Sequence, residues 1–327
     1  MIVQPNPKRI LYCVHRYAPY PGGSETYVRN MAEETLRQGH IVAVLAGEHQ
    51  GDLNGVHVSS NPEILTHPWD LIVVHGGDVS MQNFVLMNAS NPQLGGPVLY
   101  MLILPSESPV CLKGLENSTY IGCSTLADWR HVEKHGVQTK SVKVRHGIVK
   151  ETSIGQAWFR DREDIKTPYM FLSSGGYWPN KGFGELVEIF TSIKRTDVTL
   201  VLTGYDNRHG LMPRSTQFIK SYLLENRDDM LSALKDSDLY ILNSTTEGFG
   251  LVLLESMLNM TPWVARKIAG AETMQDYGKT YTTPYELEEY LKTFVGVPSS
   301  DRIAGQYYVQ ATHLIQHTVE DILGILA

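Results

Sequence analysis

Short apolar runs alternate with segments of helical spacing along the chain, and this alternation constrains the fold more than any other feature. The runs at 10–14, 41–45, 71–74 and 98–104 are apolar at almost every position, not at every second one. Strands with this pattern belong to parallel sheets whose two faces are both covered by helices. The sequence therefore predicts an α/β fold built from doubly wound, Rossmann-like sheets.

A charged stretch at residues 160–164 separates two rounds of this alternation, and the second round begins at 169–172. The chain has 327 residues, which is enough for two domains of ordinary size. We expect Rossmann-like domains over residues 1–150 and 151–327, facing each other across a cleft. One long helix near 306–326 is expected to close the second domain.

The composition argues against several classes of protein. A formal net charge of −7 does not suit a protein that binds nucleic acid through its bulk charge. The three cysteines include no C-x-x-C pair, which disfavours a disulfide framework or a cysteine zinc site and fits a reducing cytoplasm. No apolar run reaches the length of a membrane span, and the first one, which ends before His15, is too short for a signal peptide. We therefore expect a cytoplasmic protein without a transmembrane segment.

Ligands of doubly wound sheets bind beyond the carboxyl ends of the strands, so the loops that follow the strands form the candidate site. After the first predicted strand, Gly22 and Gly23 stand directly before a predicted helix, with Ser24 as its N-cap. Glycines let a ligand approach the backbone closely, and the free amides of a helix start favour an anion. A tight loop with a good cap explains the same residues without a ligand.

Two later loops carry charged residues in unusual places. Lys181 lies at a predicted helix start, where the helix dipole disfavours a cation unless an anion also binds there; a solvated lysine is the alternative. Glu247 and Glu255 stand eight residues apart on either side of the turn at 248–250. The amides after this turn can hold a phosphate, and the carboxylates can accept hydrogen bonds from sugar hydroxyls. Otherwise Glu247 is a helix-start acid and Glu255 a surface residue.

The order of these motifs resembles that of the retaining GT-B glycosyltransferases of family four, also called glycosyl transferases group 1. The resemblance rests on the glycine pair, on Pro179-Asn180-Lys181-Gly182 and on the run from Glu247 to Glu255. The segment from Thr261 to Ala265 also resembles the strand that follows the two-glutamate motif in that family. The resemblance implies a GT-B fold with the acceptor on the side of the first domain and a nucleotide-diphosphate sugar on the side of the second. It also implies transfer with retention of anomeric configuration and no metal or other cofactor.

The resemblance implies a role for each matching residue. Glu255 would bind the ribose hydroxyls, Glu247 would hold the hydroxyls of the donor sugar, and Lys181 would neutralise the leaving diphosphate. The glycine pair would let the first domain close over the phosphates, which the backbone of the later turn would contact. These donor-binding positions are Gly22, Gly23, Gly248, Phe249, Gly250 and Leu251.

The chain departs from the family pattern at two places. The family usually has an arginine five residues before the motif lysine, where this chain has Gly176. The candidates for the missing cation are Arg16, Arg266 and Lys267. Many relatives also have a histidine after the strand that matches 98–104, and this chain has none there. His75, at the end of another predicted strand, is a further candidate.

These departures leave other functions open. They fit a GT-B protein that binds a nucleotide-sugar or glycan with weak or no catalysis, and the fold also suits a nucleotide-sugar epimerase. A nicotinamide-dependent oxidoreductase is disfavoured, because no G-x-G-x-x-G follows the first predicted strand. The sequence identifies neither the sugar, the base nor the oligomeric state. It also leaves the acceptor open among glycan, lipid, protein and nucleic acid.

Two charged patterns are expected to be structural. Asp236 and Asp238 form a D-x-D motif, which binds metal in a different transferase fold, but they lie at a helix-to-strand junction typical of solvated turns. We expect no metal there. The basic residues between 134 and 150 form either a solvated edge of the first domain or a contact for an anionic acceptor such as a phospholipid surface.

Overall fold

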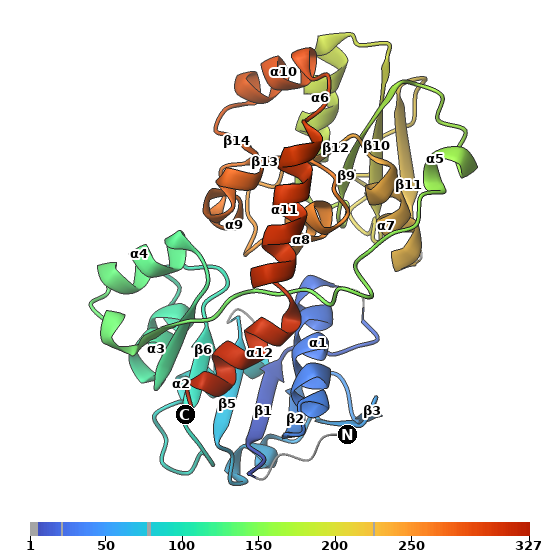
Figure 1. The fold of residues 1–327 in the computed structure, drawn as a ribbon. Helices are drawn as coiled ribbons and strands as arrows, with labels where there is room; N and C mark the ends of the chain where they lie inside the picture. The colour runs from blue at the N-terminus through green and yellow to red at the C-terminus, as the bar shows by residue number, and fades with distance from the viewer. Residues whose placement is uncertain (1–5, 21, 77–79, 225) are drawn as a thin grey trace. The chain divides into compact units, whose positions relative to one another are not determined.

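The computed structural model describes residues 6–20, 22–76, 80–224 and 226–327, and the chain forms two compact units (Figure 1). The first unit comprises Met1–Ile148 and Thr312–Ala327, and the second comprises Val149–Ala311. The observed division at 148/149 lies close to the expected one, but the last residues of the chain belong to the first unit rather than the second. The expected cleft between the domains stays a prediction. No helix in the described part of the chain is long and apolar enough to cross a membrane.

The first unit has one eight-stranded sheet among its described residues, in the order β3-β4-β2-β1-β5-β6-β7-β8. All neighbouring strands are parallel except β3 and β4. The strands are β1 (Arg9–Val14), β2 (Ile41–Ala46), β3 (Gly51–Leu53), β4 (Val56–Ser59), β5 (Leu71–His75), β6 (Val98–Met101), β7 (Tyr120–Cys123) and β8 (Ser141–Lys143). The α-helices are α1 (Gly23–Arg37), α2 (Ser80–Met87), α3 (Pro109–Asn117), α4 (Leu126–Lys134) and α12 (Ile315–Gly324).

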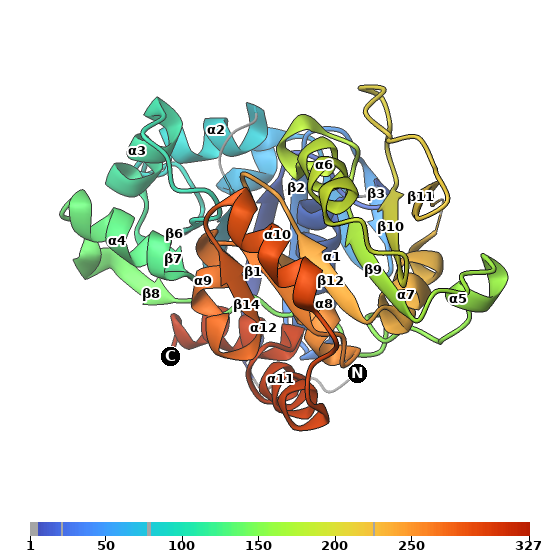
Figure 2. The same cartoon turned by 90° about the horizontal axis from the view of Figure 1, so that it is seen from above.

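The second unit has a six-stranded, fully parallel sheet in its described part, in the order β11-β10-β9-β12-β13-β14. The strands are β9 (Tyr169–Ser174), β10 (Val198–Gly204), β11 (Ile219–Leu223), β12 (Leu239–Leu242), β13 (Trp263–Arg266) and β14 (Lys279–Tyr281). The α-helices are α5 (Phe159–Arg162), α6 (Phe183–Ile193), α7 (Arg227–Asp236), α8 (Leu251–Leu258), α9 (Ala269–Thr273), α10 (Pro284–Thr293) and α11 (Ser299–Thr312). Helices α6 and α10 lie side by side and share one apolar core with the sheet (Figure 2).

Both sheets reverse their strand order beside their first strand. In the first unit β1 lies between β2 and β5, and in the second unit β9 lies between β10 and β12. The loops that leave the two strands at such a reversal diverge to opposite faces and open a crevice at the carboxyl edge. The predicted doubly wound, Rossmann-like architecture is confirmed, and in the second unit the loops after β9 and β12 leave the sheet at this reversal.

The expected single helix near 306–326 is wrong, because the chain leaves the helical conformation between α11 and α12. Leu314 is extended, with φ −85° and ψ 154°. The amide of Ile148 donates to the carbonyl of His313, and the amide of Ile315 donates to the carbonyl of Ile148, both at 2.9 Å. This strand-like pairing directs α12 onto the first unit, where Arg145 and Asp321 form an ion pair of 2.6 Å.

The start of α1 also differs from the prediction. The helix begins at Gly23, and its N-cap is Gly22 in an extended conformation, so the expected cap at Ser24 is wrong. The third helical residue, Glu25, is buried and lies against the position where a Cβ at residue 22 would be. The acid therefore occupies the space that a capping side chain at this position needs.

Two buried histidines pack against Tyr27 in the first unit, and a third buried histidine contacts one of them. The Tyr27 ring stacks on His146 at 4.9 Å and meets His75 at 5.3 Å between centroids. Nδ1 of His313 lies 2.6 Å from the carbonyl oxygen of His146. Burial lowers the pKa of all three rings, and it lowers that of His75 to about 4. The folded chain therefore holds neutral imidazoles that an unfolded chain protonates in mild acid.

We expect acid to destabilise this unit through His75. Between pH 6.5 and about 4 the unfolded state binds a proton at this residue that the folded state excludes, so the free energy of unfolding falls as the pH falls. The loss reaches about 3 kcal/mol at the lower end of this window. Urea unfolding at several pH values should show a weaker pH dependence for His75→Gln than for the unmodified chain. The exposed His67→Gln is the control, and equal slopes for all three proteins would contradict the assignment.

Candidate functional site

The second unit brings Lys181 and Glu247 together. Lys181 ends a short 3₁₀ helix (Pro179–Lys181) in the loop after β9, and Glu247 lies in the loop after β12. The Lys181 Nζ lies 2.6 Å from Oε2 of Glu247. Their side chains are 16% and 22% exposed, so the pair is shielded from water but still accessible. A cation and a carboxylate thus meet beyond the carboxyl ends of β9 and β12, where the strand order of the second sheet reverses.

Backbone and amide contacts hold the two loops against each other. Gly182 has a φ of +67°, and the Asn243 Nδ2 donates to its carbonyl oxygen at 2.7 Å. The amide of Thr245 donates to the carbonyl of Asn180 at 2.8 Å. These bonds lie directly beside Lys181 and fix its loop to the end of β12, so the charged pair does not depend on side-chain contact alone.

The turn before α8 ends on a glycine in the left-handed conformation, which favours this residue type. Gly250 is the N-cap of α8 in the left-handed region, with φ +78° and no side-chain cap. Phe249 is buried, and its carbonyl oxygen occupies the place where a Cβ at Gly270 would be. The first amides of a helix with no capping side chain point outward from its start and can bind an anion. Leu251 is the first residue of this helix.

Glu255 lies one turn along α8 and is buried. Its Oε1 forms an ion pair with Arg227, the first residue of α7, and Arg227 also donates to the Thr152 carbonyl at 3.0 Å. The sequence interpretation missed Arg227, although it is a cation at a helix start, the same signal that marks Lys181.

Tyr240, on β12, is buried. Its hydroxyl lies 2.9 Å from the Ser174 Oγ at the end of β9. Burial raises the pKa of Tyr240, and the charges of Glu247 and Glu255 raise it further.

Comparison with known proteins agrees with this geometry. Residues 168–294 match the family model described as "Glycosyl transferases group 1". Sucrose-phosphate synthase from Thermosynechococcus elongatus superimposes with a TM-score of 0.78 and 14% identity, covering 97% of this chain and 98% of that one. HepE from Anabaena gives 0.73 at 17% identity, with 98% and 99% covered. A glycosyltransferase from Rickettsia africae gives 0.75 at 16% identity, with 98% of each chain covered. No curated protein matches by sequence.

The chain has the GT-B fold, with a glycosyl transferases group 1 domain in its second unit. The fold and the resemblance predicted from the sequence are thereby confirmed. The roles of the individual site residues stay predictions.

The first unit of this GT-B chain places Arg16 beside Glu25. The Arg16 Nη2 lies 3.2 Å from Oε1 of Glu25, and the His15 Nε2 lies 3.5 Å from the same oxygen. A Cβ at residue 22 would overlap the Glu25 carboxylate, so the position of Glu25 requires a glycine there. A Cβ at Gly23 would meet nothing within 4 Å. Arg16 already has a counter-charge, supplied by the first turn of α1.

The remaining candidates for the missing cation have partners of their own. Arg266 forms an ion pair with Glu185, donates to Asn243 Oδ1 at 3.1 Å and lies 5.4 Å from the centroid of the Tyr281 ring. Arg266 thus holds the Asn243 side chain in place, and Asn243 in turn donates to the carbonyl oxygen of Gly182. The Lys267 Nζ lies 3.9 Å from Oε1 of Glu272.

His75 is not at a ligand surface within the first unit, since it is buried against Tyr27.

Gly176 marks the departure from the GT-B pattern, and the structure gives a packing reason for it. A Cβ at this position would lie 2.6 Å from the Trp178 ring. That ring meets Tyr205 edge-on at 5.7 Å between centroids, and its Nε1 donates to Asp206 at 3.3 Å. The tryptophan therefore fills the space that an arginine at 176 needs.

The D-x-D pattern has structural partners. Asp236 accepts a hydrogen bond from the Arg160 amide at 2.9 Å, and Asp238 pairs with the Arg160 guanidinium at 2.7 Å. Asp238 also accepts from the amide of Met170 at 2.8 Å. Both acids tie the segment that leads into β9 to the end of α7, rather than lying in a solvated turn.

The basic stretch between 134 and 150 does not form one cationic face. Lys134 pairs with Glu107, and Arg145 pairs with Asp321. Lys140 donates to the carbonyl of Glu116 at 2.6 Å, and His146 is buried. Much of the charge in this stretch is matched inside the first unit.

We expect Gly182→Ala to destabilise the chain by at least about 2 kcal/mol, because a left-handed alanine is strained and its Cβ would lie 2.5 Å from the Asn243 carbonyl oxygen. Gly184→Ala is the matched control, two residues away on α6 with open space around it. That substitution should be neutral or stabilise the helix by up to about 1 kcal/mol. Urea unfolding measures both, and equal effects would contradict the anchoring role of Gly182.

Proposed function

We propose that this chain is a retaining, metal-independent glycosyltransferase that moves a sugar from a nucleotide-diphosphate sugar to an acceptor. The observation that carries the proposal is the contact between Lys181 and Glu247 in the crevice of a group 1 glycosyltransferase domain. The uncapped start of α8 adds backbone amides to the same crevice. The three buried free cysteines suit a reducing compartment, and we place the reaction in the cytoplasm.

The chemistry of the transfer needs these groups. The bond between the anomeric carbon and the diphosphate oxygen breaks, and negative charge grows on the departing diphosphate. The ammonium of Lys181 and the amides at the start of α8 would stabilise this negative charge. In metal-dependent transferases a bound metal ion has that role. Glu247 accepts hydrogen bonds from the sugar hydroxyls and so holds the ring beside the lysine. Retention requires the acceptor oxygen to bond to the anomeric carbon on the face that the diphosphate leaves, and the proton of the acceptor hydroxyl passes to the departing diphosphate oxygen.

Two of the similar solved structures suggest donors for the first tests. HepE from Anabaena was solved in complex with UDP-glucose, and the catalytic domain of starch synthase IV from Arabidopsis thaliana was solved bound to ADP and acarbose. UDP and ADP are therefore the first nucleotides to test on this chain. A thermal-shift screen with UDP, GDP, ADP and TDP identifies the base, since a ligand that binds the folded state raises the melting temperature.

A second candidate function is a binding protein without turnover. The observation that favours it is Gly176, where the packing of Trp178 takes the place of the expected cation. Such a protein would bind the nucleotide-sugar but release no nucleotide across a wide panel of acceptors.

With the donor found by the screen, Lys181→Ala and Glu247→Gln should each lower kcat by about 10²- to 10³-fold, because each removes a group aimed at the reacting sugar diphosphate. Nucleotide release and product formation are both measured. Lys292→Ala and Glu289→Gln, from an exposed lysine–glutamate pair on α10, are the controls and should keep full activity. Full turnover in both site variants would refute the transferase assignment.

Glu255→Gln should weaken nucleotide-diphosphate binding by about tenfold or more, because a hydrogen bond to a charged group contributes about 1.5–3 kcal/mol. Calorimetry with the nucleotide and with its 2′,3′-dideoxy form tests where this contact is made. The unmodified chain should prefer the hydroxylated ligand, and Glu255→Gln should lose that preference. A preference that survives the substitution would mean that Glu255 does not hold the ribose.

A further inference from the structure

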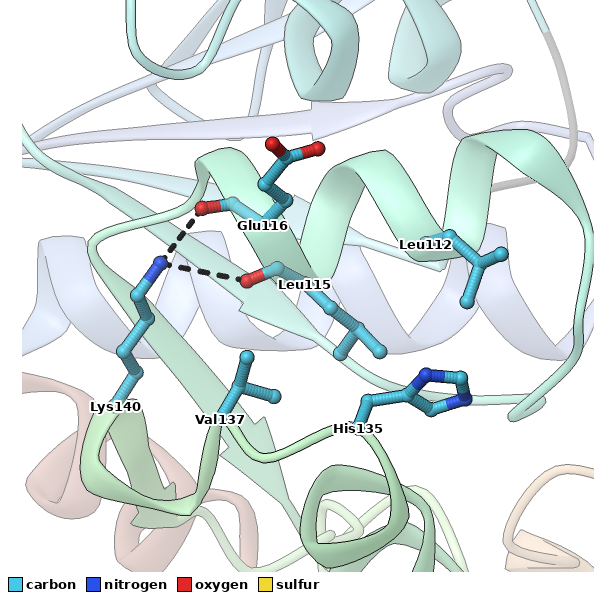
Figure 3. A pocket seen from close by; sticks show the side chains of 6 residues that line it. All are labelled: Leu112, Leu115, Glu116, His135, Val137 and Lys140. Atoms are coloured by element: carbon cyan, nitrogen blue, oxygen red, sulfur yellow. Dashed lines mark hydrogen bonds between the residues drawn. The ribbon is translucent and has the colours of Figure 1, made fainter.

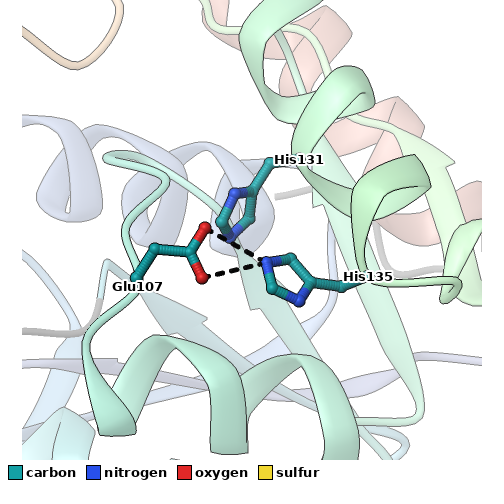
Figure 4. A group of neighbouring side chains, drawn as sticks. All are labelled: Glu107, His131 and His135. Atoms are coloured by element: carbon teal, nitrogen blue, oxygen red, sulfur yellow. Dashed lines mark hydrogen bonds and ion pairs between the residues drawn. The ribbon is translucent and has the colours of Figure 1, made fainter.

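Three ligating side chains converge in the first unit, apart from the predicted donor-binding residues. Glu107 lies in the segment before α3, His131 lies on α4, and His135 is the C-cap of that helix. One nitrogen of each imidazole and one carboxylate oxygen all lie within 4.8 Å of one another (Figure 4). Among the described residues this is the one group of three or more His, Cys, Asp or Glu side chains gathered so closely.

The spacing in the sequence explains why the two imidazoles meet. Residues four apart lie on one face of a helix, one turn above the other. The His131 and His135 rings are 4.7 Å apart between centroids. Both carboxylate oxygens of Glu107 lie 3.3 Å from the His135 Nε2. That separation equals the edge of a tetrahedron whose ligands stand about 2.0–2.1 Å from a zinc ion.

Packing fixes His131, whereas His135 and Glu107 are accessible to solvent. His131 is buried, and its Nε2 lies 3.9 Å from the Cys111 Sγ on α3. The side chains of His135 and Glu107 are 25% and 56% exposed. An ion can therefore reach the group from solvent and meet one imidazole whose position the core already fixes.

His135 also has room to adjust. Its ring lines a cavity of about 340 Å³ between α3 and the segment after α4 (Figure 3). The other lining residues are Leu112, Leu115, Glu116, Val137 and Lys140. A ring that borders open space can turn by the ångström or so that metal ligation needs without displacing a packed neighbour.

Lys134 competes with a metal for the same carboxylate. Its ammonium forms an ion pair with Oε1 of Glu107, and both side chains are exposed. Exposed pairs of this kind contribute little to stability, typically below about 1 kcal/mol. A divalent cation with two imidazole ligands can therefore displace the lysine.

We propose that Glu107, His131 and His135 form a binding site for one divalent transition-metal ion, zinc first among them. Two imidazoles and a carboxylate are a ligand set that zinc accepts, with its fourth position open to water. The bound ion would tie the segment before α3 to α4. The site was not foreseen from the sequence, which disfavoured a cysteine zinc site and a metal role for Asp236 and Asp238 and did not consider these three residues.

The test uses the full chain, freed of metal by a chelator and titrated with Zn²⁺ against a chromogenic competitor. The unmodified chain should bind one zinc ion and melt at a higher temperature with it. Glu107→Gln and His135→Gln change accessible side chains, so the fold should survive. Each should weaken zinc binding by more than about tenfold and remove the thermal shift. Lys134→Met should tighten binding, because it removes the competing ammonium.

Two variants serve as matched controls. Glu116→Gln removes another exposed carboxylate of the same face that pairs with a lysine, and His209→Gln removes an exposed histidine of the second unit. Both should bind zinc as the unmodified chain does. The proposal is overturned if the unmodified chain binds no stoichiometric zinc, or if the site variants bind it as tightly as the controls.

Discussion

The ion pair between Lys181 and Glu247 is the interaction on which the candidate site depends. Its partners come from loops 66 residues apart, and they meet because those loops leave adjacent strands where the order of the sheet reverses. Both charged groups are largely shielded from water. Each therefore serves as the counter-charge that the other needs in this partly buried position. The strand order therefore determines where the two loops meet, and the loops carry the charged side chains of the candidate site.

In both units a cation in the loop after the first strand forms an ion pair with a nearby carboxylate. Arg16 faces Glu25 in the first unit, as Lys181 faces Glu247 in the second. Under the proposed function, an entering diphosphate would meet a cation that is already neutralised, so binding would be an exchange of partners. Selectivity would then rest on groups whose direction is fixed in advance, such as the backbone amides at the start of α8, more than on net positive charge.

The sequence predicted buried strands where β1, β2, β5, β6 and β9 lie, and the two-sheet architecture, for physical reasons, but it did not predict the short strands β3, β4 and β8. Continuous apolar runs are diagnostic of buried parallel strands, and a lysine at a helix start is anomalous unless something negative lies near it. The break at His313 was not predictable, because it depends on pairing with Ile148, far away in the chain. The role of Gly176 was equally hidden, since the orientation of the nearby Trp178 ring over this position depends on its contacts with Tyr205 and Asp206 in the folded chain.

The return of α12 to the first unit has a consequence for how the molecule is made. The ribosome completes every residue of the second unit before it reaches the helix that packs on α1. During synthesis the nascent N-terminal portion must wait with part of its apolar surface uncovered, while the later sheet can already condense. The first unit can therefore complete its packing only after the second unit has been synthesised.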